Sequence, residues 1–318
     1  MNQTAADPNV SRAPAKVSSR IAMKLSRDKY LYLLAIPGIL YFLVYRYIPM
    51  LGTVIAFQDY SPFLGFSDSP WVGWKHFRTI LSAPEVIQVL WNTLYLSFLQ
   101  IVFAFPAPIV LALMLNEVRS ELYKRLIQTV VYLPHFLSWV IVVGIFIIFL
   151  RGEGLINHFL EVVLGWQPVD FLTNLSFFRP LIILQVLWKE VGWGTILFLA
   201  ALAGINPDLY EASIVDGAGR WRQIWHVSLP GIRSTIVILL ILRLGNVLDS
   251  GFEHIFLMQN SFNKEISNVL DTYVYYMGIE QSDFSFATAV GLFKGLIGLV
   301  LVLGANRLAK RFGEEGIY

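Results

Sequence analysis

The chain has 318 residues, of which 56% are hydrophobic and only 14% are Asp, Glu, Lys or Arg, and its formal net charge is +2. Soluble domains carry about 25% charged residues, so this composition indicates a protein whose solvent is a lipid bilayer. The small net charge gives no sign of a nucleic-acid partner. The absence of cysteine excludes disulfides, thiolate metal sites and cysteine nucleophiles.

The first 28 residues are polar and show no apolar periodicity, so we interpret residues 1–28 as a flexible cytoplasmic tail. A cleaved signal peptide is the alternative. The apolar run after Lys29 extends past Phe42 with no small-residue cleavage site behind it, which favours a retained helix. Residues 29–318 are then expected to form one transmembrane domain.

A helix that crosses a bilayer needs about 20 mostly apolar residues. Six stretches meet this requirement: Tyr30–Met50, Val89–Leu115, Leu126–Leu150, Leu181–Ala203, Ser234–Leu248 and Ala287–Leu308. Prolines inside the first three predict kinked helices whose neighbours satisfy the freed carbonyls. The fifth stretch gives the weakest signal, because Arg243, Asn246 and Asp249 lie in or near it. The predicted fold class is all-α, a polytopic membrane protein with six transmembrane helices.

Lys and Arg gather on the cytoplasmic side of membrane proteins. With the N-terminus inside, fifteen of the 24 Lys and Arg fall in inner segments, six at outer ends and loops, and three within spans. This count predicts a multi-pass inner-membrane protein with both termini in the cytoplasm. The outer loops mix polar and aromatic residues, which fits either plain connections with interfacial aromatic side chains or a surface for a partner; they cover 59–85, 152–178 and 251–285.

A polar loop, residues 206–231, lies on the predicted cytoplasmic side between the fourth and fifth stretches. Asn206-Pro207-Asp208 is a helix-start signal. Asn is a favoured N-cap, Pro suits the first turn, and Asp is stabilised by the positive end of the helix dipole. We expect a short helix over Pro207–Val215. Gly217 and Gly219 then allow a turn that needs positive φ.

A second short helix is predicted over Arg220–Ser228, with Pro230 ending it. Trp221, Ile224 and Trp225 are spaced i, i+3, i+4 and form one apolar stripe on this helix. The alternatives are an ordinary amphipathic surface loop and a DNA-binding helix-turn-helix. The second alternative is disfavoured because the loop is tied to the membrane at both ends and carries few basic residues.

The loop reads Glu211-Ala212-Ser213, three residues, Gly217, nine residues, Val227, one residue, Leu229-Pro230. This pattern resembles the cytoplasmic coupling loop of binding-protein-dependent ABC importers, in which Ala and Ile stand where this chain has Ser213 and Val227. The resemblance implies a permease subunit driven by an ATPase on another polypeptide. It assigns ATPase coupling to Glu211, Ala212, Ser213, Asp216, Gly217, Trp221, Leu229 and Pro230.

The resemblance extends along nearly the whole chain, to permeases of polysaccharide and oligosaccharide uptake such as the alginate importer permease subunits. It is carried by Tyr47-Ile48-Pro49-Met50-Leu51-Gly52, Ser69-Pro70-Trp71-Val72-Gly73-Trp74, Asn116-Glu117-Val118-Arg119, Tyr132-Leu133-Pro134-His135-Phe136, Asp271-Thr272-Tyr273-Val274-Tyr275 and Ala305-Asn306-Arg307-Leu308. It implies the type I ABC importer permease fold. It also implies a second, different permease subunit, an ATP-binding subunit dimer and an extracytoplasmic sugar-binding protein as partners.

Motifs for catalysis are missing from the sequence. There is no phosphate-binding Gly-rich loop with Lys, no His-Glu-x-x-His and no Gly-x-Ser-x-Gly turn. The five histidines are widely scattered, so no metal site is expected. We therefore expect that this chain is not an enzyme and binds no cofactor itself. ATP and Mg are expected on the partner ATPase.

Polar and charged side chains inside spans face the bundle interior or a water-filled path, and aromatic faces stack on sugar rings. The candidate substrate path is Trp188, Lys189, Trp193, Arg243, Asn246 and Asp249. Arg243 and Asn246 share a helix face, whereas Asp249 is expected to face elsewhere. Lys189 and Glu190 point about 100° apart and are not expected to face one partner. The alternative role of these residues is structural pairing between helices or snorkelling near helix ends.

These observations together predict a permease subunit of an ATP-driven importer that moves a saccharide across the inner membrane. An ABC permease for a non-sugar solute is the first alternative. A stand-alone secondary transporter is the second, and it is disfavoured because no inverted repeat is visible.

Overall fold

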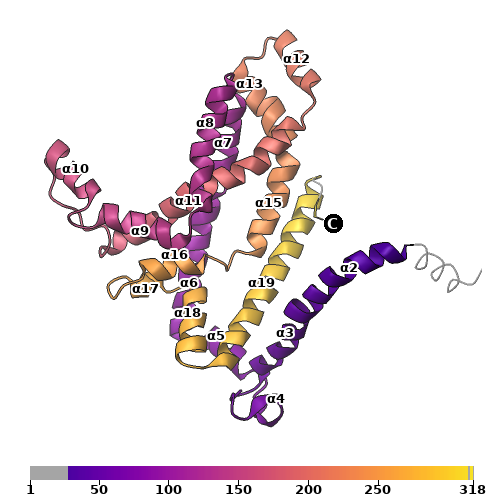
Figure 1. The fold of residues 1–318 in the computed structure, drawn as a ribbon, viewed down its shortest axis with the longest axis vertical. Helices are drawn as coiled ribbons and strands as arrows, with labels where there is room; N and C mark the ends of the chain where they lie inside the picture. The colour runs from indigo at the N-terminus through magenta and orange to yellow at the C-terminus, as the bar shows by residue number, and fades with distance from the viewer. Residues whose placement is uncertain (1–27, 314–315, 318) are drawn as a thin grey trace, which may run out of the picture. The chain divides into compact units, whose positions relative to one another are not determined.

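The computed structural model describes residues 28–313 and 316–317. The predicted tail lies outside these residues except for Asp28. Every regular element in the described part is a helix or helical turn, with one isolated bridge between Gln58 and Trp71 and no strand (Figure 1). This confirms the all-α prediction. The chain divides into two compact units, one ending at Val54 and one beginning at Ile55.

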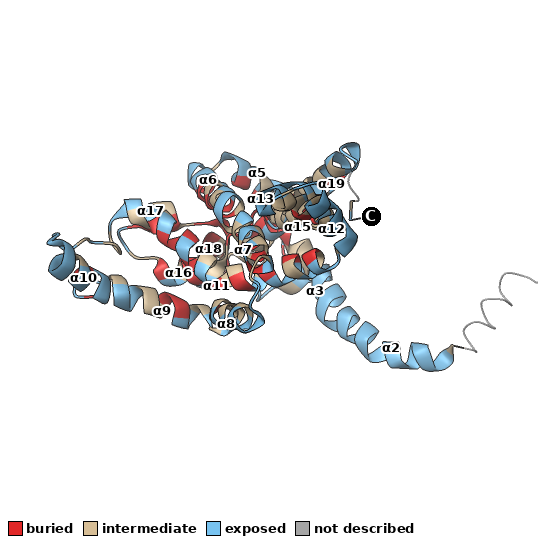
Figure 2. Ribbon diagram, turned by 90° about the horizontal axis from the view of Figure 1, so that it is seen from above, coloured by how far each residue is buried: buried red, intermediate tan, exposed pale blue. Residues whose placement is uncertain are grey.

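The first unit is a single apolar rod. It comprises α2 (Lys29–Phe42), the π-helical turn η1 (Leu43–Tyr47) and α3 (Ile48–Leu51), and the 3-10 turn η2 (Gly52–Phe57) leads into the second unit. None of α2, η1 or α3 has a buried residue, and α2 is exposed along its length in Figure 2. A helix that is apolar on all sides belongs in lipid or against another protein.

The second unit contains the longer helices. They are α6 (Pro84–Leu99), η3 (Gln100–Ala104) and α7 (Pro106–Asn116), then α8 (Glu121–Tyr132), η4 (Leu133–Phe136), α9 (Trp139–Leu150), α11 (Leu175–Ala203), α15 (Arg233–Gly245) and α19 (Phe284–Arg311). Shorter helices connect them: α4 (Gly65–Asp68), α5 (Lys75–Ser82), α10 (Leu155–Leu164), α12 (Pro207–Val215), α13 (Arg220–Gln223), η5 (Ile224–Ser228), α14 (Leu229–Gly231), α16 (Phe252–Met258), α17 (Lys264–Ser267), α18 (Leu270–Tyr275) and η6 (Tyr276–Glu280).

The described residues contain five segments long and apolar enough to cross a membrane, or six if one bent pair counts as a single span. The bent pair joins Arg220–Gly231 to Arg233–Gly245 at 57°. The other segments are Lys29–Phe57, Pro84–Asn116, Trp139–Leu164, Leu175–Ala203 and Phe284–Arg311. The weak fifth stretch of the prediction therefore qualifies as a span only together with the helical segment before it, and the bend lies between the two.

The third predicted stretch, Leu126–Leu150, is wrong as a single helix. Pro134 lies in a 3-10 turn that separates α8 from α9, and Ser138 caps α9 by accepting from the Ile141 amide. Proline removes a helical hydrogen bond and crowds the preceding turn, while a Ser cap favours a fresh helix start. The two signals together produce a break where only a kink was expected.

Helix α11 lies at the centre of the second unit and packs along α7 and α8, while α15 packs along α19. The contact is made at backbone distance. A Cβ added to Gly192 would lie 2.2 Å from the Val131 carbonyl oxygen, and one added to Gly194 would lie 2.8 Å from Pro108 Cγ. Glycine at these two positions lets α11 approach its neighbours more closely than any other residue permits.

Candidate functional site

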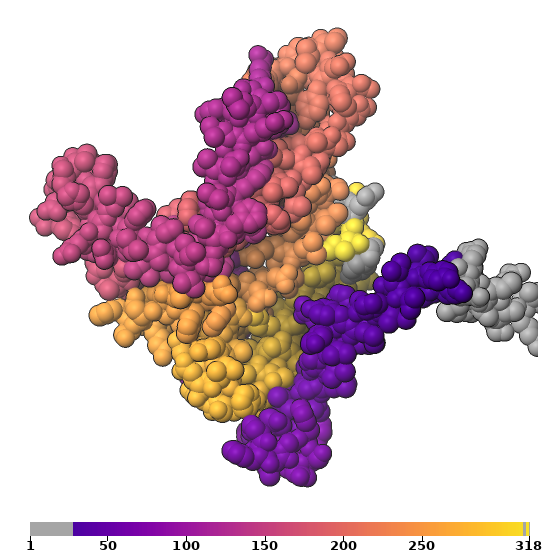
Figure 3. Space-filling view, in the orientation of Figure 1, coloured from indigo at the N-terminus to yellow at the C-terminus, as the bar shows by residue number. Residues whose placement is uncertain are grey.

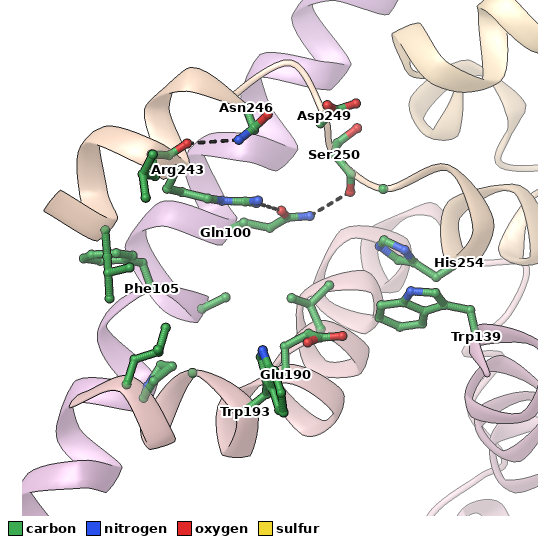
Figure 4. A pocket seen from close by; sticks show the side chains of 18 of the residues that line it. Gln100, Phe105, Trp139, Glu190, Trp193, Arg243, Asn246, Asp249, Ser250 and His254 are labelled. Carbon is green, nitrogen blue, oxygen red and sulfur yellow. Dashed lines mark hydrogen bonds between the residues drawn. The ribbon is translucent and has the colours of Figure 1, made fainter. Parts of the chain in front are cut away.

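A cavity of about 750 Å³ lies among η3, α7, α11, α15 and α16 (Figure 4). Polar side chains line one wall of the cavity and aromatic side chains line the other, with carboxylates at the edges. The polar and charged residues that line it are Gln100, Glu190, Arg243, Asn246, Asp249, Ser250, Glu253 and His254. The aromatic residues are Phe105, Trp139, Trp193 and Phe252.

The polar wall is built around Gln100, the first residue of the π-helical turn η3. Pro106 offers no N–H and its ring crowds the carbonyl four residues back, which favours a wider turn just before it. The Gln100 side chain is buried, accepts a hydrogen bond from Arg243 and donates to the Ser250 carbonyl at 3.0 Å. A neutral amide thus holds the guanidinium in place.

Asp249, at the edge of the same cavity, attracts the charge of Arg243 without forming an ion pair with it. Among the described residues, no carboxylate lies within ion-pair distance of its guanidinium. Asn246 lies one turn further along and donates to the Leu242 carbonyl at 3.1 Å. Both line the cavity, as their shared helix face predicted. This wall therefore offers a cation beside amide groups, which suits an anionic or hydroxyl-rich solute.

The opposite wall carries two stacked aromatic pairs. Trp193 lies on the His135 ring with centroids 4.4 Å apart and planes 5° apart, and Trp139 lies on His254 at 4.3 Å and 25°. The Glu190 carboxylate accepts a hydrogen bond from His135 Nδ1 at 2.9 Å. The wall therefore combines flat apolar faces with a carboxylate.

Two residues of the predicted path do not line the cavity. Lys189 is buried, and its ammonium group donates to the carbonyls of His135 at 2.6 Å and Leu137 at 2.7 Å. Trp188 packs near Phe146, with ring centroids 6.1 Å apart. Lys189 thus satisfies carbonyls that the break between α8 and α9 leaves unpaired, which is a structural role.

The expectation that Lys189 and Glu190 do not share a partner is wrong. Lys189 donates to the main-chain carbonyl of His135, and Glu190 contacts the imidazole ring of the same residue. Helix geometry separates the two Cα–Cβ directions by about 100°, but both side chains are long, and η4 lies against α11 between them. The single turn η4 therefore contacts both side chains.

His254 was not predicted as a site residue. It is 2% exposed, both ring nitrogens lack a hydrogen-bond partner in the described chain, and burial lowers its pKa to about 4. Gly251 makes room for it: its φ is +97°, and a Cβ there would lie 2.2 Å from His254 Cε1. The sequence signal was a glycine three residues before a histidine, which is weak alone.

Asp249 lies at the cavity edge and beyond the end of α15. Its Oδ1 is 2.8 Å from the Lys294 ammonium group, which also contacts Asp271. Burial raises the pKa of Asp271, and the hydrogen bond from Lys294 opposes this. Asp249 therefore pairs with α19 and also lines the same cavity as Arg243 and Asn246. The expectation that it faces elsewhere is wrong, because α15 ends at Gly245 and the helical period does not extend to Asp249.

The coupling loop forms the helix–turn–helix that its sequence predicts. Helix α12 spans Pro207–Val215, and the Asn206 side chain accepts from the Asp208 amide at 3.0 Å. Gly217 has a φ of +73°, as expected, whereas Gly219 has a φ of −73° and needs no glycine. The second helix runs on past Pro230 to Gly231, and the bend follows at Ile232.

Hydrogen bonds join the two short helices to each other. Gln223 donates to Ser213 Oγ at 3.0 Å, and the Tyr210 hydroxyl lies 3.0 Å from Ser228 Oγ. Ser213 is the residue that departs from the pattern of the resembled loops, and here it supplies an acceptor that alanine lacks. These hydrogen bonds brace the two short helices against each other.

The outer surface of the loop is bare. Trp221 is 74% exposed, Trp225 60% and Val215 87%, and Glu211 is exposed beside them. The loop lies at the top of Figure 3, where its salmon-coloured atoms face outward. Contiguous apolar surface rimmed by polar groups marks an interaction site.

A family model described as the inner membrane component of binding-protein-dependent transport systems matches residues 104–314. The chain belongs to this family. The match includes the coupling loop and every predicted path residue. Members are non-catalytic membrane subunits of ABC importers, and this chain has their type I permease fold.

Individual relatives match over almost the full length of this inner membrane component. Protein LplB of Bacillus subtilis (strain 168) is 55% identical over 295 residues, which is 92% of each chain. The polygalacturonan/rhamnogalacturonan transport system permease protein YteP of the same organism is 53% identical over 299 residues, 94% of this chain and 93% of that protein. A chain in the crystal structure of a bacterial alginate ABC transporter, in complex with an alginate pentasaccharide-bound periplasmic protein, is 41% identical, has a TM-score of 0.86 and covers 94% of this chain and 100% of that one.

Proposed function

We propose that this chain is one of two different permease subunits of an ATP-driven importer, and that it moves an acidic saccharide through the cavity beside Arg243. The observation that carries the proposal is the guanidinium of Arg243, which makes no direct ion pair, is held by Gln100 and faces a space large enough for a small oligosaccharide. The relatives named for polygalacturonan and alginate transport support a saccharide whose units carry carboxylates.

Residues 29–318 act as the permease domain in this proposal, with residues 1–28 as a cytoplasmic tail and both termini inside. The substrate path comprises Trp193, Arg243, Asn246 and Asp249. Lys189 supports it from behind, and Trp188 lies outside it. The guanidinium of Arg243, beside amides and aromatic faces, recognises a ring that carries hydroxyl and carboxylate groups.

The ATP-binding subunit dimer docks on the coupling loop 206–231. ATP and Mg are bound by that dimer, since this chain contributes no phosphate loop. Exposed Trp221 fills a groove on that subunit and Glu211 meets a basic group. Leu229 and Pro230 join the loop to α15, which carries Arg243. An extracytoplasmic saccharide-binding protein delivers the solute from the opposite side, and its docking selects the outward-facing state.

Reconstitution of the complete importer in vesicles tests this function. With the second permease, the ATPase and the binding protein present, uptake of labelled trigalacturonate should require ATP and the binding protein. Uptake without ATP would instead support a secondary transporter. ATP-dependent uptake of amino acids or peptides with none of saccharides would support a permease for a non-sugar solute.

A further inference from the structure

A second hollow, of about 540 Å³, is separate from the cavity that contains Arg243. It is a groove between α6 with η3 on one side and the first half of α11 on the other, and the two hollows share no lining residue. Its lining residues are apolar except for Tyr95, Ser176 and Arg179. The groove therefore combines hydrocarbon walls with a single charged side chain.

Arg179 is held in place by two residues of α6. Its Nη2 donates to Asn92 Oδ1 at 3.2 Å, and its guanidinium carbon lies 4.5 Å from the centre of the Tyr95 ring. Asn92 is itself buried, and its Nδ2 donates to the carbonyls of Glu265 at 2.8 Å and Asn268 at 3.0 Å. Because its partners are fixed, the cation is positioned before a ligand binds.

The positive charge of Arg179 has no carboxylate partner. No Asp or Glu in the described part of the chain lies within ion-pair distance of it. Its Nε is buried and makes no hydrogen bond to any described residue. A guanidinium has five N–H donors, while an amide and an aromatic ring supply no negative charge. Arg179 therefore retains both charge and donors for an anion.

The groove lies on surfaces that belong in a membrane. Both of its walls are parts of segments long and apolar enough to cross a bilayer, Pro84–Asn116 and Leu175–Ala203. Phe103 and Leu184, one on each wall, are exposed. Arg179 lies one turn after the first residue of α11, near the end of its span, where lipid headgroups and the hydrocarbon core meet.

We propose that this groove binds an anionic phospholipid, with the phosphate on Arg179 and an acyl chain along the apolar walls. The walls alone would accept any hydrocarbon chain, whereas a fixed guanidinium beside them selects a negatively charged headgroup. A cation within a span is costly without a counter-charge. The lipid phosphate supplies that charge where the chain itself does not.

Photo-crosslinking of the complex of both permeases and the ATPase tests this site. The complex is reconstituted in a neutral bilayer that contains a trace of phosphatidylglycerol or of phosphatidylcholine, each with the same diazirine on its acyl chain. Labelled peptides are identified by mass spectrometry. Phosphatidylglycerol should label the walls of the groove, residues 95–103 and 175–187, about fivefold more than phosphatidylcholine, the scale of one basic residue with an anionic lipid.

Four variants separate charge, shape and fold. Arg179→Gln should lower labelling by phosphatidylglycerol to the level of phosphatidylcholine, and Arg179→Lys should keep the preference. Leu184→Trp fills the groove while Arg179 stays in place, and it should lower labelling by both lipids. Arg151→Gln removes an exposed arginine at the end of α9, outside the groove, and should change neither. Melting temperatures of all variants are recorded beside the labelling.

Other occupants of the groove give other results, and each would overturn the proposal. Equal labelling by the two lipids in the wild type would show that charge plays no part. No labelling of the groove by either lipid would show that a helix of the second permease covers it. Loss of labelling in excess inorganic phosphate would assign Arg179 to a free anion, and loss in excess trigalacturonate would assign the groove to the saccharide.

Discussion

The ammonium group of Lys294 lies 2.8 Å from Asp249 Oδ1 and also contacts Asp271, so one cation on α19 binds two carboxylates. Asp271 is largely buried, and its Oδ2 has no hydrogen-bond partner in the described chain. The arrangement ties the end of α15 to α18 and α19. Its stability depends on the single cation.

Removal of that cation should destabilise the protein. Lys294→Met leaves the buried Asp271 unpaired and should lower the free energy of unfolding by about 3 kcal/mol. The double variant Lys294→Met, Asp271→Asn removes the unpaired charge and should recover much of the loss. Thermal unfolding of the purified complex measures both. Equal stability of the single variant and the wild type would contradict the role assigned to Lys294.

Arg243→Gln should leave the protein assembled and reduce uptake of an acidic saccharide at least tenfold, because the guanidinium makes no direct ion pair and its hydrogen bond goes to the neutral Gln100. Arg243→Lys keeps the charge and should retain part of the uptake. Uptake by proteoliposomes is measured beside melting temperature. A fall in stability that matches the fall in uptake would make Arg243 a structural residue and remove it from the path.

Gly217→Val should abolish binding-protein-stimulated ATP hydrolysis while the protein still reaches the membrane. The φ of Gly217 is +73°, which a β-branched residue adopts only with strain of about 1–2 kcal/mol. Gly219→Ala is the matched control, because its φ is −73° and its Cβ has open space. Similar hydrolysis rates for the two variants would show that the turn is not required for coupling.

Glu211→Lys should weaken attachment of the ATP-binding subunit, because it reverses an exposed charge at the proposed contact. Glu121→Lys makes the same reversal on exposed α8, outside the loop, and should have no effect. Co-purification of the ATPase with the membrane subunits is the measurement. Retention of the ATPase by both variants at wild-type level would argue against docking through Glu211.

Acid should destabilise the protein through His254. Its folded pKa, about 4, lies below the ordinary value of 6.5, so the unfolded chain binds more protons between these two values. The free energy of unfolding should therefore fall as pH drops through this window, by about 2 kcal/mol between pH 7 and pH 5. His254→Phe keeps the stack on Trp139 and should remove this component. Melting temperature as a function of pH checks it, and identical pH profiles would contradict it.

Local chemistry explains where sequence interpretation succeeded. Helix α12 was predicted with its observed bounds, because its cap, its proline and its glycine turn all lie within a dozen residues. The positions of Arg243 and Asn246 on one cavity wall also followed from helix period alone. Trp188 and Trp193 were both predicted to lie in the path, but they are five residues apart, about 140° on a helix, and only Trp193 lines the cavity.

Contacts between segments far apart in the sequence explain where sequence interpretation failed. His135 meets Glu190 across 55 positions, and Gln100 meets Arg243 across 143. Both partners are single polar residues in apolar runs, with nothing nearby that identifies their pairing. Pro134 was read as a kink, but the Ser138 cap beyond it turns the kink into a break. His254 escaped notice because its burial depends on packing against Trp139.

The glycines of α11 bear on how force passes through the molecule. Gly192 lies against the Val131 carbonyl and Gly194 against the Pro108 ring, so at these two positions α11 contributes no side chain to its contact with α8 and α7. The contact of α11 with its neighbours is stiff at these positions, because backbone cannot repack as side chains do. Helix α11 is also unbroken over 29 residues and ends three residues before α12. We therefore expect a displacement of the coupling loop to be carried along α11 as far as Trp193.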